Sequence, residues 1–401
     1  MFPPWPLYEV DEIEAVVRVL ASGKVNYWSG DEGRNFEREF AIYHGMPYAV
    51  AVANGTVALE LALYALGIGP GHEVVVTPRT FVASVSSVVL SGAIPVFADV
   101  DPNSGNITPD TVRQVITGKT KAIMTVHLGG WPCDMNGFKT LADEHGLILI
   151  EDCAQAHGAR IDGRLAGSFG DAAAFSFCTD KIMSTGGEGG MVLFRKEDAW
   201  RRAWGYKDHG KNWDAVYNRD HPPGFRWLHE SFGTNWRLTE MQAAIGRLQL
   251  QKLDGWIKKR RQNADFLIEG FSGICGLRVP VPGKQVAHSW YRFYVYVRPE
   301  RLKDGWDRDA VMQSAVRLGI PCMQGICPEV YLEKAFNRRG KTAEIGMRQL
   351  EDGRLRPANR LPVARELGEN SLMFTVHPTL GAAEMKKIVE VMTMIMKRAT
   401  A

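Results

Sequence analysis

Residues 175–190 read FSFCTDKIMSTGGEGG, an apolar run that ends in one lysine and a loop of small residues. A strand that passes Lys181 into such a loop lets the amine point inward, where loss of water favours the neutral, nucleophilic form. That form can bond covalently to a carbonyl carbon as a Schiff base. Ser176 lies on the same run and can offer its hydroxyl to a phosphate. The alternative interpretation is a surface lysine beside a flexible loop.

An earlier apolar run, ILIEDCAQAHGA at residues 148–159, carries two adjacent carboxylates. A carboxylate at the end of a buried strand is costly unless a cation meets it. A pyridine-type cofactor supplies that cation, because an aspartate facing the ring nitrogen keeps it protonated and lets the ring withdraw electrons. Asp152 is therefore a candidate partner for a pyridine ring. A structural role, capping the next turn, is an equal alternative.

Two more motifs stand where strands are expected to end, at the edge of an open α/β sheet that binds ligands. Asn54-Gly55-Thr56 separates a strand from a helix, so its backbone N–H groups suit a phosphate. An ordinary helix cap is the alternative. The segment GTNWRLTE, residues 233–240, offers Asn235 as a donor to a phosphate and Arg237 as a planar fork for a carboxylate. A surface salt bridge is the alternative for Arg237.

The apolar pattern around these motifs predicts an α/β fold. Between residues 45 and 195, short apolar runs alternate with helix-sized intervals, which indicates a mostly parallel sheet between helices. A helix of more than twenty residues is expected from Glu240. Beyond it, a strand at 289–297 and helices at 308–319 and 382–399 indicate a smaller α+β domain. We therefore expect a large domain over residues 1–255 and a small domain over 256–401. The expected large-domain strands are AVAV (49–52), EVVVTP (73–78), IPVFADVD (94–101), TKAIMTVH (120–127), LILIED (147–152) and AAAFSF (172–177).

The composition excludes several classes of protein. The chain has 401 residues and a net charge of +3, so it lacks the basic surface expected of a nucleic-acid-binding protein and has no pull towards anionic membranes. No apolar run is long enough to span a membrane, and the N-terminus does not resemble a signal peptide. The six scattered cysteines fit reduced thiols in the cytoplasm. Cys322 and Cys327 lack further ligands at zinc spacing, so no metal is expected.

Taken together, these motifs resemble the DegT/DnrJ/EryC1/StrS aminotransferases, a branch of the fold type I pyridoxal-phosphate enzymes. The resemblance covers nearly the whole chain. It implies a fold type I architecture, pyridoxal 5′-phosphate as cofactor, and a homodimer with shared active sites. The segments that carry it include NGTVALELAL, GPGHEVVVTPRTFVAS, GAIPVFADVDP, TKAIMTVHLGGWPCDM, IEDCAQAHGA, FSFCTDKIMSTGGEGGMV and NWRLTEMQAAIGRLQL.

The resemblance also implies roles for individual residues. Lys181 would carry the cofactor as a Schiff base and Asp152 would hold the pyridine nitrogen. The remaining contacts it implies are Gln155 to the ring hydroxyl, Phe81 against the ring face, Gly55, Thr56 and Ser176 to the phosphate, Asn235 to the phosphate of the partner's site, and Arg237 to the carboxylate of the amino donor.

The implied reaction is transamination from L-glutamate to a 4-keto or 3-keto sugar linked to a nucleotide. Such a reaction serves amino-sugar synthesis for surface polysaccharides, such as lipopolysaccharide O-antigen, or for natural products. A cyclitol ketone of the inosose type is an alternative acceptor, because EDCAQAHGA is also similar to the cyclitol aminotransferases. A non-catalytic cofactor-binding module is less favoured, since Lys181 is present.

The acceptor region departs from the family pattern. The usual His-Tyr-x-Pro-x-His stretch reads GIPCMQGICPEVYLEKAF, and an arginine, Arg292, stands where the family often has histidine. A nucleoside diphosphate needs cationic donors, so we expect Arg292, or Arg338 with Arg339, to contact it. Solvated arginines are the alternative.

Overall fold

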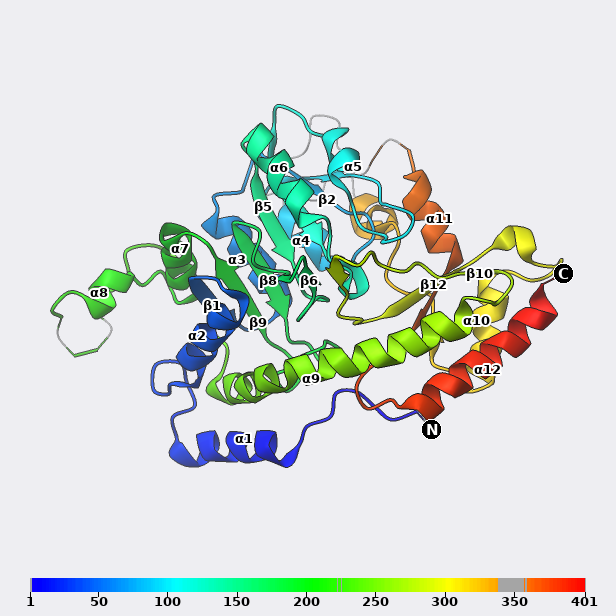
Figure 1. Cartoon of the computed structure of the whole chain (residues 1–401). Coiled ribbons are helices and arrows are strands. Elements are labelled where there is room, and N and C mark those ends of the chain that lie inside the picture. Colours follow the sequence, from blue (N-terminus) through cyan, green and yellow to red (C-terminus); the bar gives the residue numbers. More distant parts are fainter. Residues whose placement is uncertain (1, 222, 225, 338–356, 358, 401) are drawn as a thin grey trace.

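The computed structural model describes residues 2–400 except 222, 225, 338–356 and 358 (Figure 1). Its centre is a seven-stranded sheet in the order β1-β9-β8-β5-β4-β2-β3. Neighbouring pairs among β8, β5, β4, β2 and β3 are parallel, as the alternating pattern predicts. The strands are β1 (Tyr48–Val52), β2 (Glu73–Val76), β3 (Ile94–Phe97), β4 (Thr120–Val126), β5 (Ile148–Asp152), β8 (Ala172–Ser176) and β9 (Gly190–Phe194).

One edge of this mostly parallel sheet is antiparallel. Strand β9 was not predicted, and it runs antiparallel between β8 and β1. The chain between β8 and β9 forms a loop that contains Lys181 and no helix. Parallel strands need a crossover connection, usually a helix, so this loop returns the chain in the opposite direction. The glycine-rich segment is therefore placed at the carboxyl end of β8.

Helices cover both faces of this sheet, which explains why its strands are apolar on both sides. Val50 and Val52 of β1 face a core shared with α3, α4 and α7, whereas Ala49 and Ala51 face α2 and α9. The helices of this part are α1 (Val10–Ser22), α2 (Glu32–His44), α3 (Gly55–Ala65), α4 (Ala83–Leu90), α5 (Pro109–Arg113), α6 (Met135–His145), α7 (Glu197–Lys207), α8 (Trp213–Tyr217) and α9 (Glu240–Phe271).

Helix α9 joins the two parts of the molecule. Thr239 caps it in a capping box with Gln242, and it continues for 32 residues. Leu253 packs in the core of the large sheet, and Ala264 packs in a second core with α12. We propose that the two domains divide within this stretch of α9, which contains the predicted boundary between residues 255 and 256.

The second core lies beneath an antiparallel sheet in the order β10-β12-β14-β13. The strand predicted at 289–297 begins only at Phe293, because the backbone N–H groups of Ser289 and Arg292 donate to Gly130 and Gly129 of the large domain. The elements here are β10 (Leu277–Arg278), β12 (Phe293–Val297), α10 (Arg308–Arg317), β13 (Cys322–Met323), α11 (Pro362–Asn370), β14 (Ser371–Phe374) and α12 (Ala382–Ala399). A small third sheet consists of β6 (Arg160–Ile161), β7 (Arg164–Leu165) and β11 (Val286–Ala287).

Four strand ends meet at one edge of the large sheet. The segments that follow β1, β2, β5 and β8 at their carboxyl ends contain the motifs around Gly55, Phe81, Asp152 and Lys181. This edge faces the small domain through β12 and β13. None of the helices in the described part of the chain is long and apolar enough to cross a membrane.

Candidate active site

A cavity of about 730 Å³ opens between the sheet edge and the small domain. This volume lies within the range of small-molecule sites. Its lining includes eight residues that the sequence predicts for cofactor or substrate: Gly55, Thr56, Phe81, Asp152, Gln155, Ser176, Lys181 and Arg292.

Lys181 lies mostly buried in the loop after β8, with 16% of its side chain exposed. Its Nζ is 3.9 Å from Asp180 Oδ1 and 5.0 Å from the centroid of the Tyr291 ring. The backbone is held on both sides, since its N–H donates to Cys178 and its carbonyl accepts from Trp5 Nε1 at 2.7 Å. The amine therefore belongs to the cavity wall, and the alternative of a surface lysine is wrong.

Asp152 ends β5 with its carboxylate in the cavity. Oδ2 accepts from Ser84 Oγ at 2.7 Å and Oδ1 accepts from the Ala154 N–H at 3.1 Å. Burial raises the pKa of Asp152, although the Ser84 hydrogen bond opposes this shift. The contact with Ala154 is the turn-capping role considered from the sequence. Both hydrogen bonds come from neutral donors, so this buried carboxylate is suited to a protonated ring nitrogen.

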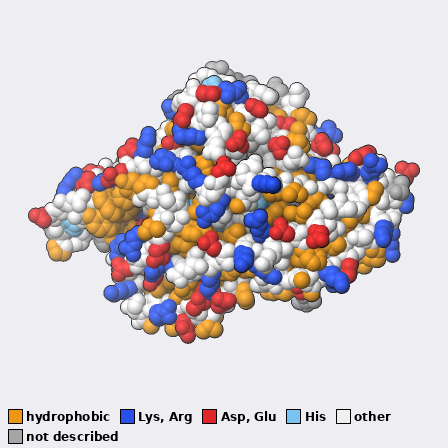
Figure 2. Space-filling model, viewed as in Figure 1, with side chains coloured by type: hydrophobic (Ala, Val, Ile, Leu, Met, Phe, Trp, Pro, Cys, Tyr) orange, Lys and Arg blue, Asp and Glu red, His pale blue; other side chains and the backbone are white. Residues whose placement is uncertain are grey.

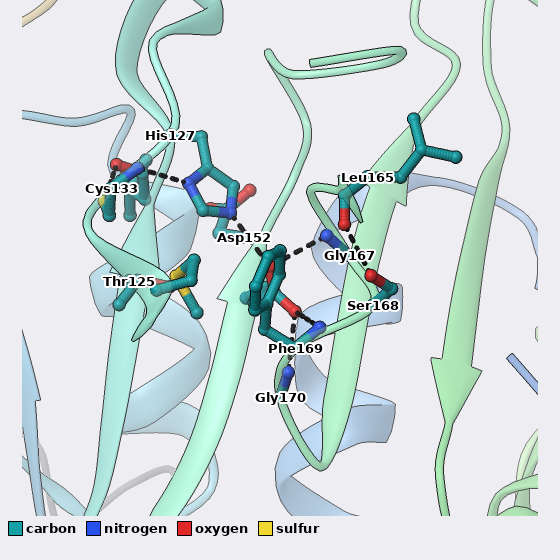
Figure 3. A network of polar contacts seen from close by, with 12 residues as sticks. Thr125, His127, Cys133, Asp152, Leu165, Gly167, Ser168, Phe169 and Gly170 are labelled. Atoms are coloured by element: carbon teal, nitrogen blue, oxygen red, sulfur yellow. Dashed lines mark hydrogen bonds and ion pairs between the residues drawn. The ribbon is translucent and has the colours of Figure 1, made fainter. Parts of the chain in front are cut away.

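The neighbouring Glu151 has a structural role, and Figure 3 labels its partners His127, Gly167, Phe169 and Gly170. Glu151 is fully buried and accepts N–H groups from Gly167, Phe169 and Gly170 at 2.7–2.8 Å. His127 Nε2 lies 3.2 Å from the same carboxylate, and His127 Nδ1 accepts from the Cys133 N–H, so the proton is on Nε2. Burial raises the pKa of Glu151, but His127 and the backbone N–H groups outweigh it and leave the pKa lowered. This network fixes the end of β5 and thereby the position of Asp152.

The N-terminus of α3 forms a cradle that is suited to a phosphate. Asn54 caps the helix by accepting from the Val57 N–H at 3.0 Å, so the helix cap considered as the alternative is present. A Cβ on Gly55 would lie 2.6 Å from Ser176 Cβ, and only glycine lets the first turn approach β8 this closely. The first N–H groups of a helix have no partner within it and carry the positive end of its dipole. Gly55, Thr56 and Ser176 line the cavity together at this point.

Phe81 and Gln155 occupy positions suited to a flat ring. Phe81 is 60% exposed although it lies in the wall of the cavity, so its face is open to a stacking partner. Gln155 is buried, and its Oε1 accepts from the Gly129 N–H at 2.8 Å, which leaves the amide NH₂ as the donor. A carboxylate, an aromatic face, an amide donor, a phosphate cradle and an amine thus converge, and this set fits pyridoxal 5′-phosphate.

Asp180 and Tyr291 are among the cavity residues that the sequence did not predict. The Tyr291 hydroxyl donates to Asp180 Oδ2, and Arg292 Nη2 donates to the same oxygen at 2.9 Å. Burial opposes ionisation of Asp180, but Lys181, Tyr291 and Arg292 leave its pKa lowered. Asp180 directly precedes Lys181 and Tyr291 directly precedes Arg292 in the sequence. Adjacency to a predicted site residue was the feature of the sequence that could have identified Asp180 and Tyr291.

Two predicted site residues, Asn235 and Arg237, are not brought to this cavity. Arg237 lies outside its lining and forms a salt bridge with Asp208 at 2.7 Å, which is largely buried and is not the surface salt bridge considered as the alternative. Asn235 is exposed on the segment that pairs with Asp208. Their roles stay predictions that depend on a second subunit. Arg338 and Arg339 lie outside the described residues.

Comparisons with known proteins agree with this geometry. A family model described as the DegT/DnrJ/EryC1/StrS aminotransferase family matches residues 6–393. An aminotransferase structure from Psychrobacter cryohalolentis is 52% identical, covers 100% of both chains and has a TM-score of 0.94. The dTDP-3-amino-3,4,6-trideoxy-alpha-D-glucose transaminase of Streptomyces venezuelae is 34% identical over 94% of this chain and 89% of its own. The L-glutamine:2-deoxy-scyllo-inosose aminotransferase of Streptomyces fradiae is 38% identical over 82% of this chain and 78% of its own.

Proposed function

Because the chain belongs to the DegT/DnrJ/EryC1/StrS aminotransferase family, whose members depend on pyridoxal 5′-phosphate, we propose that it transfers the amino group of L-glutamate to a nucleotide-linked keto sugar. The observation that carries the proposal is the convergence in one cavity of Lys181, Asp152 and the cradle formed by Gly55 and Ser176. The keto group would be at C4 or C3 of the sugar. The product would serve amino-sugar synthesis for a surface polysaccharide or a natural product.

Each residue of the cavity has a defined task in this proposal. Lys181 binds the cofactor covalently, Asp152 holds its ring nitrogen, and Gln155 donates to its ring hydroxyl. When bound, pyridoxal 5′-phosphate supplies an electron-withdrawing ring that makes the α-hydrogen of the amino donor acidic. Lys181 Nζ, once free, is placed to take that proton and to return it. Phe81 stacks on the ring, while Gly55, Thr56 and Ser176 bind the phosphate.

The acceptor is proposed from the relatives and from one arginine. The Streptomyces venezuelae relative is named for a nucleotide-linked 3-amino sugar, which supports a sugar of this class. Arg292 reaches the cavity and has N–H groups beyond those used by Asp180 and Tyr291, so it can contact a diphosphate. A cyclitol ketone is the second candidate, favoured by the similarity to the inosose aminotransferase.

We propose a homodimer in which each subunit completes the other's site. On the face of the molecule in view, Figure 2 shows exposed hydrophobic side chains where α7 and α8 lie. In the segment after α8, Trp227 is 88% exposed and Phe232 is 96% exposed, which indicates a surface covered by another chain. Asn235 follows this segment and lies outside its own cavity. A second copy would cover the aromatic side chains and place Asn235 at the partner's phosphate. The six unpaired cysteines, all in the described part, support a cytoplasmic location.

An acceptor screen tests the proposed reaction. Release of 2-oxoglutarate from L-glutamate is measured with 3-keto and 4-keto nucleotide sugars and, separately, with inososes. L-Glutamine is run in parallel, because the inosose relative is named for that donor. We expect turnover with at least one nucleotide sugar. Turnover with inososes alone would replace the proposed acceptor by the second candidate, and a requirement for L-glutamine would replace the donor.

A further inference from the structure

Three side chains from two domains meet around one oxygen next to the proposed cofactor lysine. Asp180 Oδ2 accepts from Tyr291 and from Arg292 Nη2, and Asp180 Oδ1 faces Lys181 Nζ at 3.9 Å. Arg292 Cζ lies 4.5 Å from the centroid of the Tyr291 ring, and Lys181 Nζ lies 5.0 Å from the same centroid. One carboxylate is therefore shared between two cationic groups, of which one is the reactive amine.

This arrangement differs from an ordinary surface ion pair. The side chains of Arg292 and Lys181 are each only 16% exposed, so solvent screens these two cationic groups less than it does at the surface, while the Asp180 side chain between them is 51% exposed. At 3.9 Å a carboxylate stabilises positive charge on a neighbouring nitrogen. An arginine bound to the same carboxylate weakens that effect. The other titratable groups that line the cavity or interact with Lys181 are Asp152, His157, Cys178, Glu188, Tyr291 and Tyr294.

We propose that Asp180 is a positioning residue for Lys181, and that the Asp180–Arg292 pair sets how readily the lysine nitrogen holds a proton. Asp180 favours the protonated nitrogen, and Arg292 limits this by sharing the carboxylate. The nitrogen must hold a proton in one half of the reaction and release it in the other, so two opposed charges keep it between these states. The inference rests on the proposed role of Lys181 as the residue that binds the cofactor.

The test uses the holoenzyme and the absorption of its lysine-bound cofactor as a function of pH. Asp180→Asn keeps an oxygen for Tyr291 and Arg292 but removes the charge, so the titration midpoint should fall by about half a pH unit or more. Arg292→Met removes the opposing charge at similar length, so the midpoint should rise. In the double variant the two shifts should largely cancel. Glu188→Gln removes a charge from an exposed side chain of the same cavity, and this control should leave the midpoint nearly unchanged.

Opposite signs for the two single variants are the decisive result, because general damage to the site would not produce them. Shifts in the same direction, or shifts no larger than that of Glu188→Gln, would overturn the inference. If Asp180→Asn does not fold, Tyr291→Phe replaces it. Without the phenol donor, the negative charge of Asp180 has one hydrogen bond fewer and acts more strongly on the lysine nitrogen, so the titration midpoint should rise. An unchanged midpoint would overturn the inference.

A separate experiment distinguishes failure of the inference from failure of the proposed function. Borohydride reduction of the wild-type holoenzyme, followed by peptide mass analysis, should find the cofactor on Lys181. Attachment at another residue would overturn both the proposed function of Lys181 and this inference. Attachment at Lys181 without opposite shifts would overturn the inference alone.

Discussion

Asp152 and Glu151 are adjacent buried carboxylates whose pKa values shift in opposite directions, because burial raises both but their hydrogen-bond partners differ. Glu151 receives three backbone N–H groups and His127, and it stays ionised as part of the scaffold. Asp152 receives one hydroxyl and one N–H, and burial raises its pKa. A positive ring nitrogen would complete the partners of Asp152, whereas Glu151 needs none. One residue is therefore suited to chemistry and the other to support.

Substitution of these two residues should separate the roles. Asp152→Asn is expected to retain the cofactor but slow transamination at least about a hundredfold, or about 2.7 kcal/mol in the barrier, because the charge that favours a protonated ring nitrogen is lost. Stopped-flow absorbance of the L-glutamate half-reaction measures the rate. Glu151→Gln is the control and should mainly lower the free energy of unfolding, by roughly 1–3 kcal/mol. Near-normal turnover of Asp152→Asn would leave only its turn-capping role.

At the level of elements, the N-terminal segment 2–8 connects the small domain to the lysine loop. The Pro4 carbonyl accepts from Thr379 Oγ1, and Trp5 packs edge-on against Trp256 while donating to the Lys181 carbonyl. Tyr8 donates to Ser184 Oγ and accepts from the Gly186 N–H. The segment thus holds the loop at several points and fixes the backbone from which the Lys181 side chain extends.

Trp5→Phe should reveal this support. The substitution keeps an aromatic ring, although a smaller one, but removes the hydrogen bond to the Lys181 carbonyl. Loss of such a hydrogen bond costs roughly 0.5–1.5 kcal/mol of stability. Covalent capture of pyridoxal 5′-phosphate by the apoprotein, followed by absorbance, should therefore become several-fold slower. Trp256→Phe is the matched control, since Trp256 contacts the Trp5 ring but takes no part in the hydrogen bond from Trp5 to the Lys181 carbonyl. Equal slowing in both variants would show that only aromatic packing matters.

The sequence predicted those parts of the fold that depend on local pattern. The apolar runs predicted β2, β3, β4, β5 and β8, and the helical spacing predicted α9 and α12. Strand β9 was missed because its pairing depends on the path of the loop before it. Trp5 was missed because it contacts Lys181 across 176 positions of sequence, and no local pattern reports such a contact. Arg237 forms a salt bridge within its own chain, so its expected role depends on a second subunit that the sequence does not position.

For the whole molecule, complementation tests the proposed shared sites. Lys181→Ala and Asn235→Ala chains are each expected to be poorly active. A mixed dimer would contain one site with both lesions and one site with neither. After equal mixing and subunit exchange, about a quarter of wild-type activity should return, because half of the dimers are mixed and each has one intact site. Full activity from a demonstrably monomeric wild-type preparation would contradict the shared site.

Buried histidines should make the whole molecule sensitive to acid. Burial lowers the pKa of His44 to about 4 and those of His157 and His288 to about 3. The unfolded chain takes up these protons near its ordinary pKa of 6.5, and the folded chain does not. The free energy of unfolding is therefore fully retained above pH 6.5 and decreases as the pH falls below that value. At pH 5 the decrease is about 2 kcal/mol for each histidine.

Urea titrations at pH 7 and pH 5 check this expectation. His157→Leu removes an imidazole that packs between Phe175 and Phe177, and it should reduce the difference in stability between the two pH values by about 2 kcal/mol. The exposed His145 at the end of α6 is the control, and His145→Gln should leave that difference unchanged. An unaltered difference in His157→Leu would show that other groups cause the acid sensitivity.

Helix α9 has a consequence for motion. It is 32 residues long, or about 48 Å at 1.5 Å per residue, and it takes part in both hydrophobic cores. Rotation of one domain against the other must therefore bend a continuous rod and cannot use a loop hinge there. Gly246 and Gly270 press against Phe36 and Val389, but a Cβ on Gly255 would meet nothing within 4 Å. Bending of the helix should therefore be easiest at Gly255, between the two cores, and we expect only small-amplitude movement of the domains about that point.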